Sequence, residues 1–387
     1  MLNIAFTGGG TGGHIYPGLA VAAQLKKLLT GREYRLFWIG SSAGMDRSLV
    51  ENAGIEFFGV PSGKLRRYFS LRTIIDFFKV AGGFFAARKI LKKNKTVFLF
   101  SKGGFVSVPP CVAAASLKIP VFTHESDYSP GLATRINSRF VKQTGRIFTA
   151  YEDTARFFNE KIRDRITVSG NPVREDFRFA DSAKGKKFLG IEEDSHLNQQ
   201  FKQTPRILLI LGGSQGAKEI NDLVRESLDE LIKIYTVVHQ TGPNLNWDIP
   251  ESEKYKPFPY IKEKMPHVMA AAELVMGRSG AGIWEWAVLG KPMLLIPLRG
   301  SGTRGDQIEN ARFFENAKAA RVLLPQGGSG DKIDVKELIS AVNEIAHNDK
   351  KRSAMAAASA KIGEKDGAQI IAQILFNNIA GNGGGVY

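Results

Sequence analysis

A glycine-rich stretch near the N-terminus constrains the fold of this chain more than any other feature. It runs Thr7-Gly-Gly-Gly-Thr-Gly-Gly-His-Ile-Tyr-Pro17, between an apolar run (Leu2 to Phe6) and an apolar-periodic segment (Leu19 to Leu29). This order predicts a strand, a glycine loop and a helix. Glycines let the backbone approach a ligand closely, and a helix start offers N–H groups to an anion or a polar substrate. His14 is the side chain of this loop that can exchange a proton near neutral pH.

The main alternative is a dinucleotide-binding loop in which His14 is incidental. The glycine spacing does not fit the G-x-G-x-x-G pattern of such loops cleanly, and no acidic residue ends a following strand where a ribose would need one. The stretch therefore favours a site for another polar or anionic ligand.

Composition and charge limit the class of protein. The chain has 387 residues, 43% of them hydrophobic, which is enough for two α/β domains with full cores. The single cysteine, Cys111, excludes an internal disulfide and suits a reducing compartment. No apolar run reaches ~18 residues, so we expect no membrane span, and the immediate first strand leads us to expect no signal peptide. The net charge is +15, and residues 1–174 hold 26 Lys and Arg against 11 Asp and Glu, so an anionic partner should meet this half.

Strands and helical segments alternate along the first half. After the first strand, the pattern predicts strands at Tyr34–Ile39, Ile55–Val60, Thr96–Phe100, Pro120–Thr123, Arg146–Thr149 and Arg165–Val168. Such alternation predicts a mainly parallel sheet with helices on both faces. Ligands of such sheets bind at loops that leave the carboxyl ends of strands, here Gly8–Pro17, Ser101–Pro110 and His124–Gly131.

The segment from Gly63 to Lys95 combines aromatic and basic residues. Two apolar stripes fall at helical spacing: Leu71, Ile74, Ile75 and Phe78 in one, and Phe77, Phe84 and Leu91 in the other. The charged positions around them are basic except for Asp76, a pattern typical of an element lying in a lipid interface. The alternative is a sheet-covering helix with a solvated basic edge. Nucleic acid is less favoured as the anionic partner, because no nucleic-acid-binding motif accompanies the charge.

The loop His124-Glu-Ser-Asp-Tyr-Ser-Pro-Gly131 carries two carboxylates, Glu125 and Asp127, beside a histidine at a strand end. These could position a sugar hydroxyl or orient a base, and the alternative is an Asx-type turn with exposed acids. We predict no metal site, because the six histidines are scattered without a useful helical spacing to a carboxylate.

The second half restarts the same pattern. Gly and Pro in Ser169–Arg174 suggest a hinge, and residues 181–204 are polar and predicted to be irregular. A strand (Arg206–Leu211), a glycine loop (Gly212–Ala217) and a helix (Lys218–Ile234) then repeat the first motif, so the chain consists of two related α/β halves.

A further turn, Arg278-Ser-Gly-Ala-Gly-Ile-Trp-Glu285, follows a strand at Leu274–Met276 and leads into a helix. Another helix opens with Asp306, Gln307 and Asn310 near its start. A glutamate on the helix after a glycine turn can accept two hydrogen bonds from a ribose diol, and amides can bind sugar hydroxyls. Together with the anion-binding loop Gly212–Ala217, these groups are typical of a nucleotide-sugar site.

Taken together, these motifs resemble those of the peptidoglycan N-acetylglucosaminyltransferase (MurG) family. The matching pieces are Gly8–His14 with Tyr16-Pro17, Lys102–Val106, His124-Glu125, Gly170–Arg174, Gly212–Ala217, Arg278–Ala281 with Glu285, and Asp306-Gln307 with Asn310. The sequence departs from the commonest pattern of that family at Asp127, at Asp306 and in the turn after Arg278, which is one residue short.

The resemblance implies an α/β protein of GT-B architecture, with two Rossmann-like domains whose parallel sheets face a central cleft. It implies an acceptor and membrane-associating domain (1–172), a UDP-GlcNAc-binding domain (173–363) and a C-terminal helix (364–381) that returns to the first domain. The implied reaction is metal-free, cofactor-free transfer of GlcNAc from UDP-GlcNAc to the muramyl 4-hydroxyl of lipid I, with inversion, giving lipid II. The implied location is the cytoplasmic face of the cell membrane, with an anionic membrane surface and cell-wall synthesis proteins as partners and no nucleic acid.

The resemblance also implies roles for individual residues. Catalytic roles fall to His14 as the base, with Glu125 and Asp127. Donor contacts fall to Thr11, Gly12, Gly13, Arg174, Ser214, Gln215, Ile261, Ala281, Glu285, Gln307 and Asn310. Acceptor contacts fall to Gly103, Gly104, Phe105 and His124. The membrane face corresponds to Arg66, Arg67, Ile74, Phe77, Phe78, Phe84, Phe85, Arg88 and Lys89.

Three alternatives remain open at this point. One is another GT-B transferase with a lipid acceptor such as diacylglycerol. A UDP-GlcNAc epimerase shares the fold but should lack the basic aromatic segment. A non-catalytic membrane-bound nucleotide-sugar sensor belongs to a different class, and the presence of His14 with Glu285 argues against it.

Overall fold

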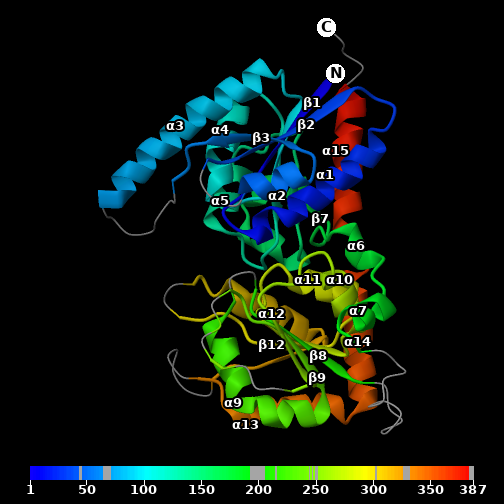
Figure 1. The fold of residues 1–387 in the computed structure, drawn as a ribbon. Coiled ribbons are helices and arrows are strands. Elements are labelled where there is room, and N and C mark those ends of the chain that lie inside the picture. The colour runs from blue at the N-terminus through cyan, green and yellow to red at the C-terminus, as the bar shows by residue number, and fades with distance from the viewer. Residues whose placement is uncertain are drawn as a thin grey trace. The chain divides into compact units, whose positions relative to one another are not determined.

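The computed structural model describes residues 1–42, 46–63, 71–191, 205–213, 216–243, 245, 247–248, 252–300, 303–325 and 332–382. The chain divides into two compact units (Figure 1). The first unit contains Met1–Arg174 together with Lys365–Tyr387, and the second contains Glu175–Glu364.

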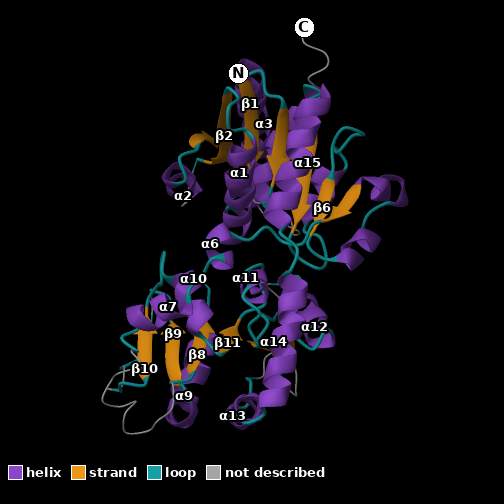
Figure 2. Ribbon diagram, turned by 90° about the vertical axis from the view of Figure 1, so that its right-hand side faces the viewer, coloured by secondary structure: helices purple, strands orange, loops and turns teal. Residues whose placement is uncertain are grey.

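The first unit is built on a parallel sheet whose described strands run in the order β3-β2-β1-β4-β5-β6-β7. Its strands are the orange arrows beside the labels β1, β2 and β6 in Figure 2. The strands are β1 (Leu2–Thr7), β2 (Tyr34–Ser41), β3 (Glu56–Val60), β4 (Phe98–Ser101), β5 (Val121–Glu125), β6 (Ile147–Thr149) and β7 (Ile166–Val168). The strand order reverses between β1 and β4, and ligands of such sheets bind outside the carboxyl ends at this switch point.

Helices cover both faces of this sheet, so alternate residues of a strand belong to different cores. Ile4 and Phe6 of β1 pack with α1 (Tyr16–Leu28), α2 (Asp46–Asn52) and α15 (Gly367–Asn382). Ala5 of the same strand packs with α3 (Leu71–Lys93) and α4 (Val108–Ser116). A short helix, α5 (Leu132–Ser138), follows β5. The C-terminal helix α15 lies against α1 and so completes the first unit (Figure 1).

The second unit repeats this plan with a parallel sheet in the order β10-β9-β8-β11-β12-β13. Its described strands are β8 (Ile207–Leu211), β9 (Thr236–Gln240), β10 (Tyr255–Phe258), β11 (Leu274–Gly277), β12 (Met293–Leu295) and β13 (Ala320–Val322). Its described helices are α6 (Glu175–Arg178), α7 (Ser182–Phe188), α9 (Lys218–Ile234), α10 (Met265–Ala271), α11 (Ile283–Val288), α12 (Asp306–Asn316), α13 (Val335–Ala346) and α14 (Asp349–Gly363). The switch point lies between β8 and β11.

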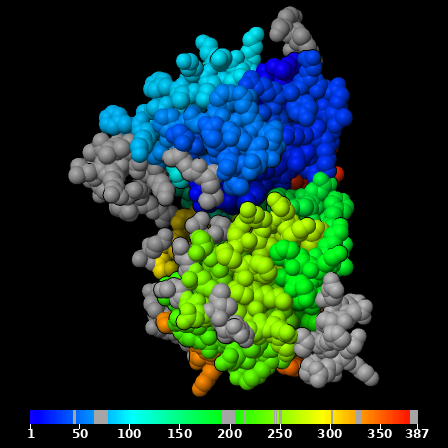
Figure 3. All heavy atoms as spheres, in the orientation of Figure 1, coloured from blue at the N-terminus to red at the C-terminus, as the bar shows by residue number. Residues whose placement is uncertain are grey.

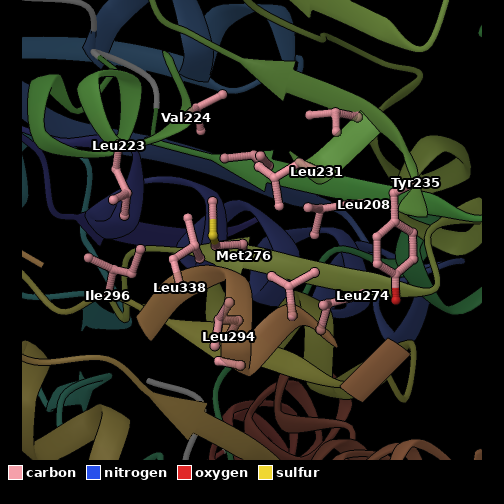
Figure 4. Close-up of a cluster of buried hydrophobic side chains, with 14 of the residues drawn as sticks. Leu208, Leu223, Val224, Leu231, Tyr235, Leu274, Met276, Leu294, Ile296 and Leu338 are labelled. Carbon is pink, nitrogen blue, oxygen red and sulfur yellow. The ribbon is translucent and has the colours of Figure 1, made fainter. Parts of the chain in front are cut away.

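The core of the second unit shows how the sequence periodicity produces this packing. Leu223, Val224 and Leu231 of α9 face Leu208 of β8 and Leu338 of α13, and all of these side chains are buried (Figure 4). Because α9 presents its apolar residues at helical spacing, one stripe faces this cluster and its charged residues face outward.

The predicted strands agree with the structure to within a few residues, but one segment differs. Residues 181–204 are expected to be irregular, whereas Ser182–Phe188 form α7. Asp181 caps this helix by accepting hydrogen bonds from the N–H groups of Ala183 (2.8 Å) and Lys184 (3.3 Å). The helix was missed because it packs on α10 through Gly185, where backbones approach closely, and not through an apolar stripe.

Among the described helices, none has the combination of length and apolarity that a bilayer span needs.

Candidate functional site

The loops after β1 and β4 meet at His14, at the switch point of the first unit. His14 ends a short 3₁₀ turn (Gly12–His14), and its Nδ1 lies 2.9 Å from the hydroxyl of Thr11. Gly103 and Gly104 of the β4 loop lie against the imidazole ring, and both have positive φ angles. Two of the three loops that the sequence predicted to bind ligand in this unit therefore come together around the predicted base.

Asp46 holds the glycine loop in place, a role that was not predicted from the sequence. Its carboxylate accepts hydrogen bonds from the N–H of Gly10 (3.1 and 3.2 Å) and the N–H of Ser41 (3.4 Å). Burial raises the pKa of Asp46, and these two backbone hydrogen bonds oppose that shift. The one sequence signal was its position as an acid just after a strand end, at the start of a helix.

Glu125 uses its carboxylate to shape the third loop of the first unit. Its oxygens accept from the N–H groups of Ser126 (2.9 Å), Asp127 (3.0 Å) and Gly131 (2.9 Å). Glu125 is buried, whereas Asp127 at the next turn is half-buried. The Glu125 carboxylate is therefore used to hold the loop, and Asp127 is the more exposed carboxylate of the two.

His124 lies fully buried beneath this loop, and its Nε2 is 3.1 Å from the carbonyl oxygen of Gly170. Since a carbonyl can only accept, Nε2 carries the proton of this ring. Burial, together with the charge of Lys102, lowers the pKa of His124 well below its usual value, so the ring is neutral. In this structure the ring of His124 supports the loop after β7 from below.

Phe105 and Arg174 complete the predicted residues of the first unit. Phe105 begins a 3₁₀ turn after Gly104 and lies against Gly10 of the first loop. The guanidinium of Arg174 lies 5.1 Å from the centre of the Tyr16 ring, a cation–π distance. Tyr16 opens α1 directly after the glycine loop, so Arg174 is held at that loop.

The second unit carries its own glycine loop at the switch point. Gly213 and Gly216 have positive φ angles of 85° and 76°, and a Cβ on Gly216 would lie 2.3 Å from the carbonyl oxygen of Thr241. The loop leads into α9, whose first N–H groups face the same edge of the sheet. Ser214 and Gln215, two of the predicted donor residues, lie outside the described residues.

A hydrogen-bond network beneath this loop links it to Ile261. The side chain of Gln240 donates to the carbonyl of Gly213 (3.4 Å) and accepts from the N–H of Ile261 (2.9 Å). Below it, the buried imidazole of His239 lies 3.1 Å from the Asn221 Oδ1 atom, and Asn221 donates to the carbonyl of Thr241 (2.9 Å). The N–H of Ile261 is thus engaged within the protein.

Glu219 joins two arginines at the first turn of α9. Arg278, after β11, donates to Glu219 (2.8 Å) and to the carbonyls of Ile296 (3.1 Å) and Pro297 (3.3 Å). Arg299, after β12, donates to the other oxygen of the same carboxylate. The cluster ties three loops together beside the glycine loop, and sequence spacing gave no signal for it.

The predicted sugar-binding residues divide into supporting and more accessible positions. Asn310 is buried and donates to the carbonyl of Ser279 (3.0 Å), and Gln307 accepts from the N–H of Leu298 (2.9 Å). Glu285 lies half-buried in the first turn of α11, and Ala281 lies just before that helix. The structure thus brings these residues to one edge of the second sheet, with Asn310 fixing the loop from below.

Comparisons with known proteins agree with this geometry. Residues 4–145 match the Glycosyltransferase family 28 N-terminal domain, and residues 207–371 match the Glycosyltransferase family 28 C-terminal domain. The chain is similar to crystal structures of MurG from Acinetobacter baumannii (TM-score 0.68, 21% identity, 97% of this chain and 100% of that chain) and of UDP-GlcNAc 2-epimerase from Neisseria meningitidis (TM-score 0.65, 16% identity, 97% and 100%). These distant likenesses support the fold.

The fold and the two family domains define a glycosyltransferase of the GT-B class. Curated relatives narrow this class. The chain is 45% identical to the UDP-N-acetylglucosamine–N-acetylmuramyl-(pentapeptide) pyrophosphoryl-undecaprenol N-acetylglucosamine transferase of Treponema denticola, over 96% of each chain. It is 40% identical to the enzyme of the same name from Staphylococcus carnosus, over 90% of each chain. The chain belongs to this MurG family.

Proposed function

We propose that this protein transfers GlcNAc from UDP-GlcNAc to the muramyl 4-hydroxyl of lipid I and so forms lipid II. The observation that carries the proposal is the convergence of the two glycine-bearing loops of the first unit on His14, in a chain whose relatives are named for this transfer. A histidine near neutral pH is suited to take the proton of a sugar hydroxyl.

The proposed reaction is a single in-line displacement. The acceptor oxygen forms a bond to C1 of GlcNAc while the bond from C1 to the UDP oxygen breaks, which inverts the configuration at C1. His14 takes the hydroxyl proton. Because Thr11 engages Nδ1, we assign the base role to Nε2. The electron pair leaves with UDP, and helix N–H groups with Arg174 stabilise its charge.

The donor-binding residues are proposed as follows. Glu285 accepts from the ribose hydroxyls, the carbonyl of Ile261 meets uracil, and Gln307 contacts the hexose, with Asn310 holding the loop behind it. Three further loops complete the donor contacts. They carry Thr11, Gly12 and Gly13 in the first, Ser214 and Gln215 in the second, and Ala281 in the third. On the acceptor side, the backbone of Gly103 and Gly104 forms the floor with Phe105, and the His124 ring holds the neighbouring loop after β7.

The membrane-facing element is proposed to be α3. Phe78 and Phe85, seven residues apart and therefore on one face of this helix, are each 69% exposed. Lys89 and Lys92 continue the same exposed face. Atoms coloured light blue to cyan, which include α3, project from the first unit in Figure 3. Arg66 and Arg67 and the side chains of Ile74 and Phe77 lie outside the described residues.

The same helix also covers the sheet, as the alternative interpretation required. Ala87 and Leu91 are fully buried, and the Nε of Arg88 lies 3.3 Å from the Ser116 hydroxyl. Phe84, half-buried, contacts the ring of Phe85. We therefore propose that one face of α3 packs on the sheet while the opposite face meets anionic lipid at the cytoplasmic face of the cell membrane.

The deciding experiment is a transfer assay. Incubation with UDP-[¹⁴C]GlcNAc and a lipid I analogue should give a radiolabelled lipid II analogue. Diacylglycerol in place of the lipid I analogue should give no labelled product. If label is transferred to diacylglycerol and not to the lipid I analogue, the protein is a glycolipid synthase. If label is transferred to neither acceptor, the proposal is refuted.

A further inference from the structure

Lys102 is a buried charged residue in the centre of the acceptor loops. It follows β4 directly and only 2% of it is exposed. Its backbone N–H donates to the carbonyl of Thr7 (2.8 Å), which fixes it to the end of β1. Lysine is almost never fully buried without a specific partner, because burying the ammonium opposes folding. The chain therefore retains this charge at a cost to stability.

The ammonium of Lys102 begins a chain of hydrogen bonds through three loops. Its Nζ donates to the Ser126 hydroxyl (2.7 Å), and that hydroxyl donates to the Oδ1 of Asn171 (2.6 Å). Ser126 belongs to the loop after β5 and Asn171 to the loop after β7. All three side chains are buried, so water does not replace these bonds. The charge of Lys102 thus fixes the relative positions of the three loops.

The stem of Lys102 also supports the loop that carries the base. A Cβ placed on Gly8 would lie 3.1 Å from the Lys102 Cβ and 2.7 Å from the backbone oxygen of His14. Gly103 and Gly104, the next two residues, lie against the His14 ring. A shift of Lys102 would therefore move both the Gly103–Gly104 backbone and the glycine loop that carries His14.

The charge balance around Lys102 depends on its protonation state. Burial lowers the pKa of Lys102 to about 8, while the charges of Glu125 and Asp127 oppose that shift. His124 is kept neutral, by burial first and by Lys102 second. Of these four titratable groups, Lys102 is the cation near neutral pH, facing two carboxylates.

We propose that Lys102 is a positioning residue for the transfer reaction, whose ammonium fixes the Gly103–Gly104 loop against His14 and balances the charge of Asp127 beside the acceptor. This inference rests on the proposed function. Lys102 would act on the reaction only by holding neighbouring residues in place, and it would not contact the reacting atoms.

The test is the pH profile of turnover in Lys102→Met and Lys102→Arg. Lys102→Met should lower kcat near neutral pH by about tenfold or more while UDP affinity, measured by calorimetry, changes by less than about twofold. The parent's kcat should fall above about pH 8, as Lys102 loses its proton. Lys102→Arg keeps its charge, so this alkaline fall should move to higher pH, and Lys102→Met should lack it.

Lys291 of the second unit offers a matched control. It is a half-buried lysine whose pKa burial lowers to about 8, and its Nζ donates to the carbonyls of Ala270 (2.7 Å) and Ala272 (2.8 Å). Lys291→Met should change stability and leave the shape of the pH profile unaltered.

Two outcomes would overturn the inference. One is a Lys102→Met protein whose kcat stays within about twofold of the parent's across the profile. The other, which decides if Lys102→Met does not fold, is a Lys102→Arg protein with the parent's alkaline fall unchanged. If the parent transfers GlcNAc and these variants have the same kcat and pH profile, this inference alone is refuted. If the parent transfers no GlcNAc, the proposed function is refuted.

Discussion

Gly104 lies so close to the imidazole of His14 that a Cβ at this position would be 3.3 Å from the ring Cγ and 2.7 Å from the carbonyl oxygen of Gly9. Its φ angle of 76° adds strain for any other residue. Gly104→Ala should therefore cost about 1–3 kcal/mol of stability and lower kcat by about tenfold or more by displacing the ring. Gly31→Ala is the matched control, since Gly31 has a φ of 83° with nothing within 4 Å. Equal kcat in the two variants would show that crowding at His14 has no effect on catalysis.

The base assignment predicts a rate effect without a binding effect. His14→Gln should lower kcat by about 10²-fold or more and leave UDP affinity nearly unchanged, because only the proton acceptor is lost. Thr11→Val removes the partner of Nδ1 and should give a smaller loss. Single-turnover assays with calorimetry for UDP would measure both. Turnover of His14→Gln close to that of the parent would transfer the base role to Asp127.

The ribose assignment predicts a binding effect common to substrate and product. Glu285→Ala should weaken UDP and UDP-GlcNAc alike by about 1.5–3 kcal/mol, since hydrogen bonds to a charged acceptor are lost. Glu226→Ala, an exposed glutamate of α9, serves as the control. Unaltered UDP affinity of Glu285→Ala in calorimetry would remove Glu285 from the donor site.

His239 predicts how the stability of the second unit depends on pH. Burial lowers the pKa of His239 to about 4. Between about pH 6.5 and 4 the unfolded chain binds a proton that the folded chain does not, so stability should fall as the pH falls through this window. The loss attributable to this group should reach about 3 kcal/mol. Urea unfolding at several pH values, compared with His239→Asn, measures it. The same pH slope in both proteins would mean that other groups account for the loss.

The membrane-facing side of α3 predicts reversible binding to anionic vesicles. Phe78→Ser with Phe85→Ser should weaken binding, because these exposed rings would leave the lipid interface. Changing Lys89, Lys92 and Lys93 to Gln should remove about 1 kcal/mol per residue and flatten the salt dependence. Phe179→Ser is the control, since Phe179 is 74% exposed but belongs to the second unit. If all variants sediment with vesicles as the parent does, at both low and high salt, α3 has only a packing role.

The sequence allowed the first sheet and the ligand-binding edges of both sheets to be predicted, because parallel strands buried on both faces have apolar runs that end in glycine loops. In the second sheet, β9, β10 and β13 were not predicted. His14 and the Gly103–Gly104 loop could be expected to meet, since the loops of adjacent strands share one edge. Asp46, Glu219 and the bonds of Lys102 could not be predicted in this way. Apart from Ser41 beside Asp46, their partners lie tens of residues away, and a hydrogen bond or an ion pair between residues distant in the sequence has no spacing rule. Asn310 matched a family motif, yet its contact with Ser279 became visible only in three dimensions.

The return of α15 to the first unit has a consequence for synthesis on the ribosome. Ile371, Ala372, Leu375 and Ile379 fill the core on the α1 side of the first sheet, although almost two hundred residues of the second unit are made before them. The nascent first unit must therefore wait with an open apolar face while the second unit is translated. A chaperone would cover that face in the meantime, and premature termination before α15 would leave it open permanently, which favours aggregation or proteolysis.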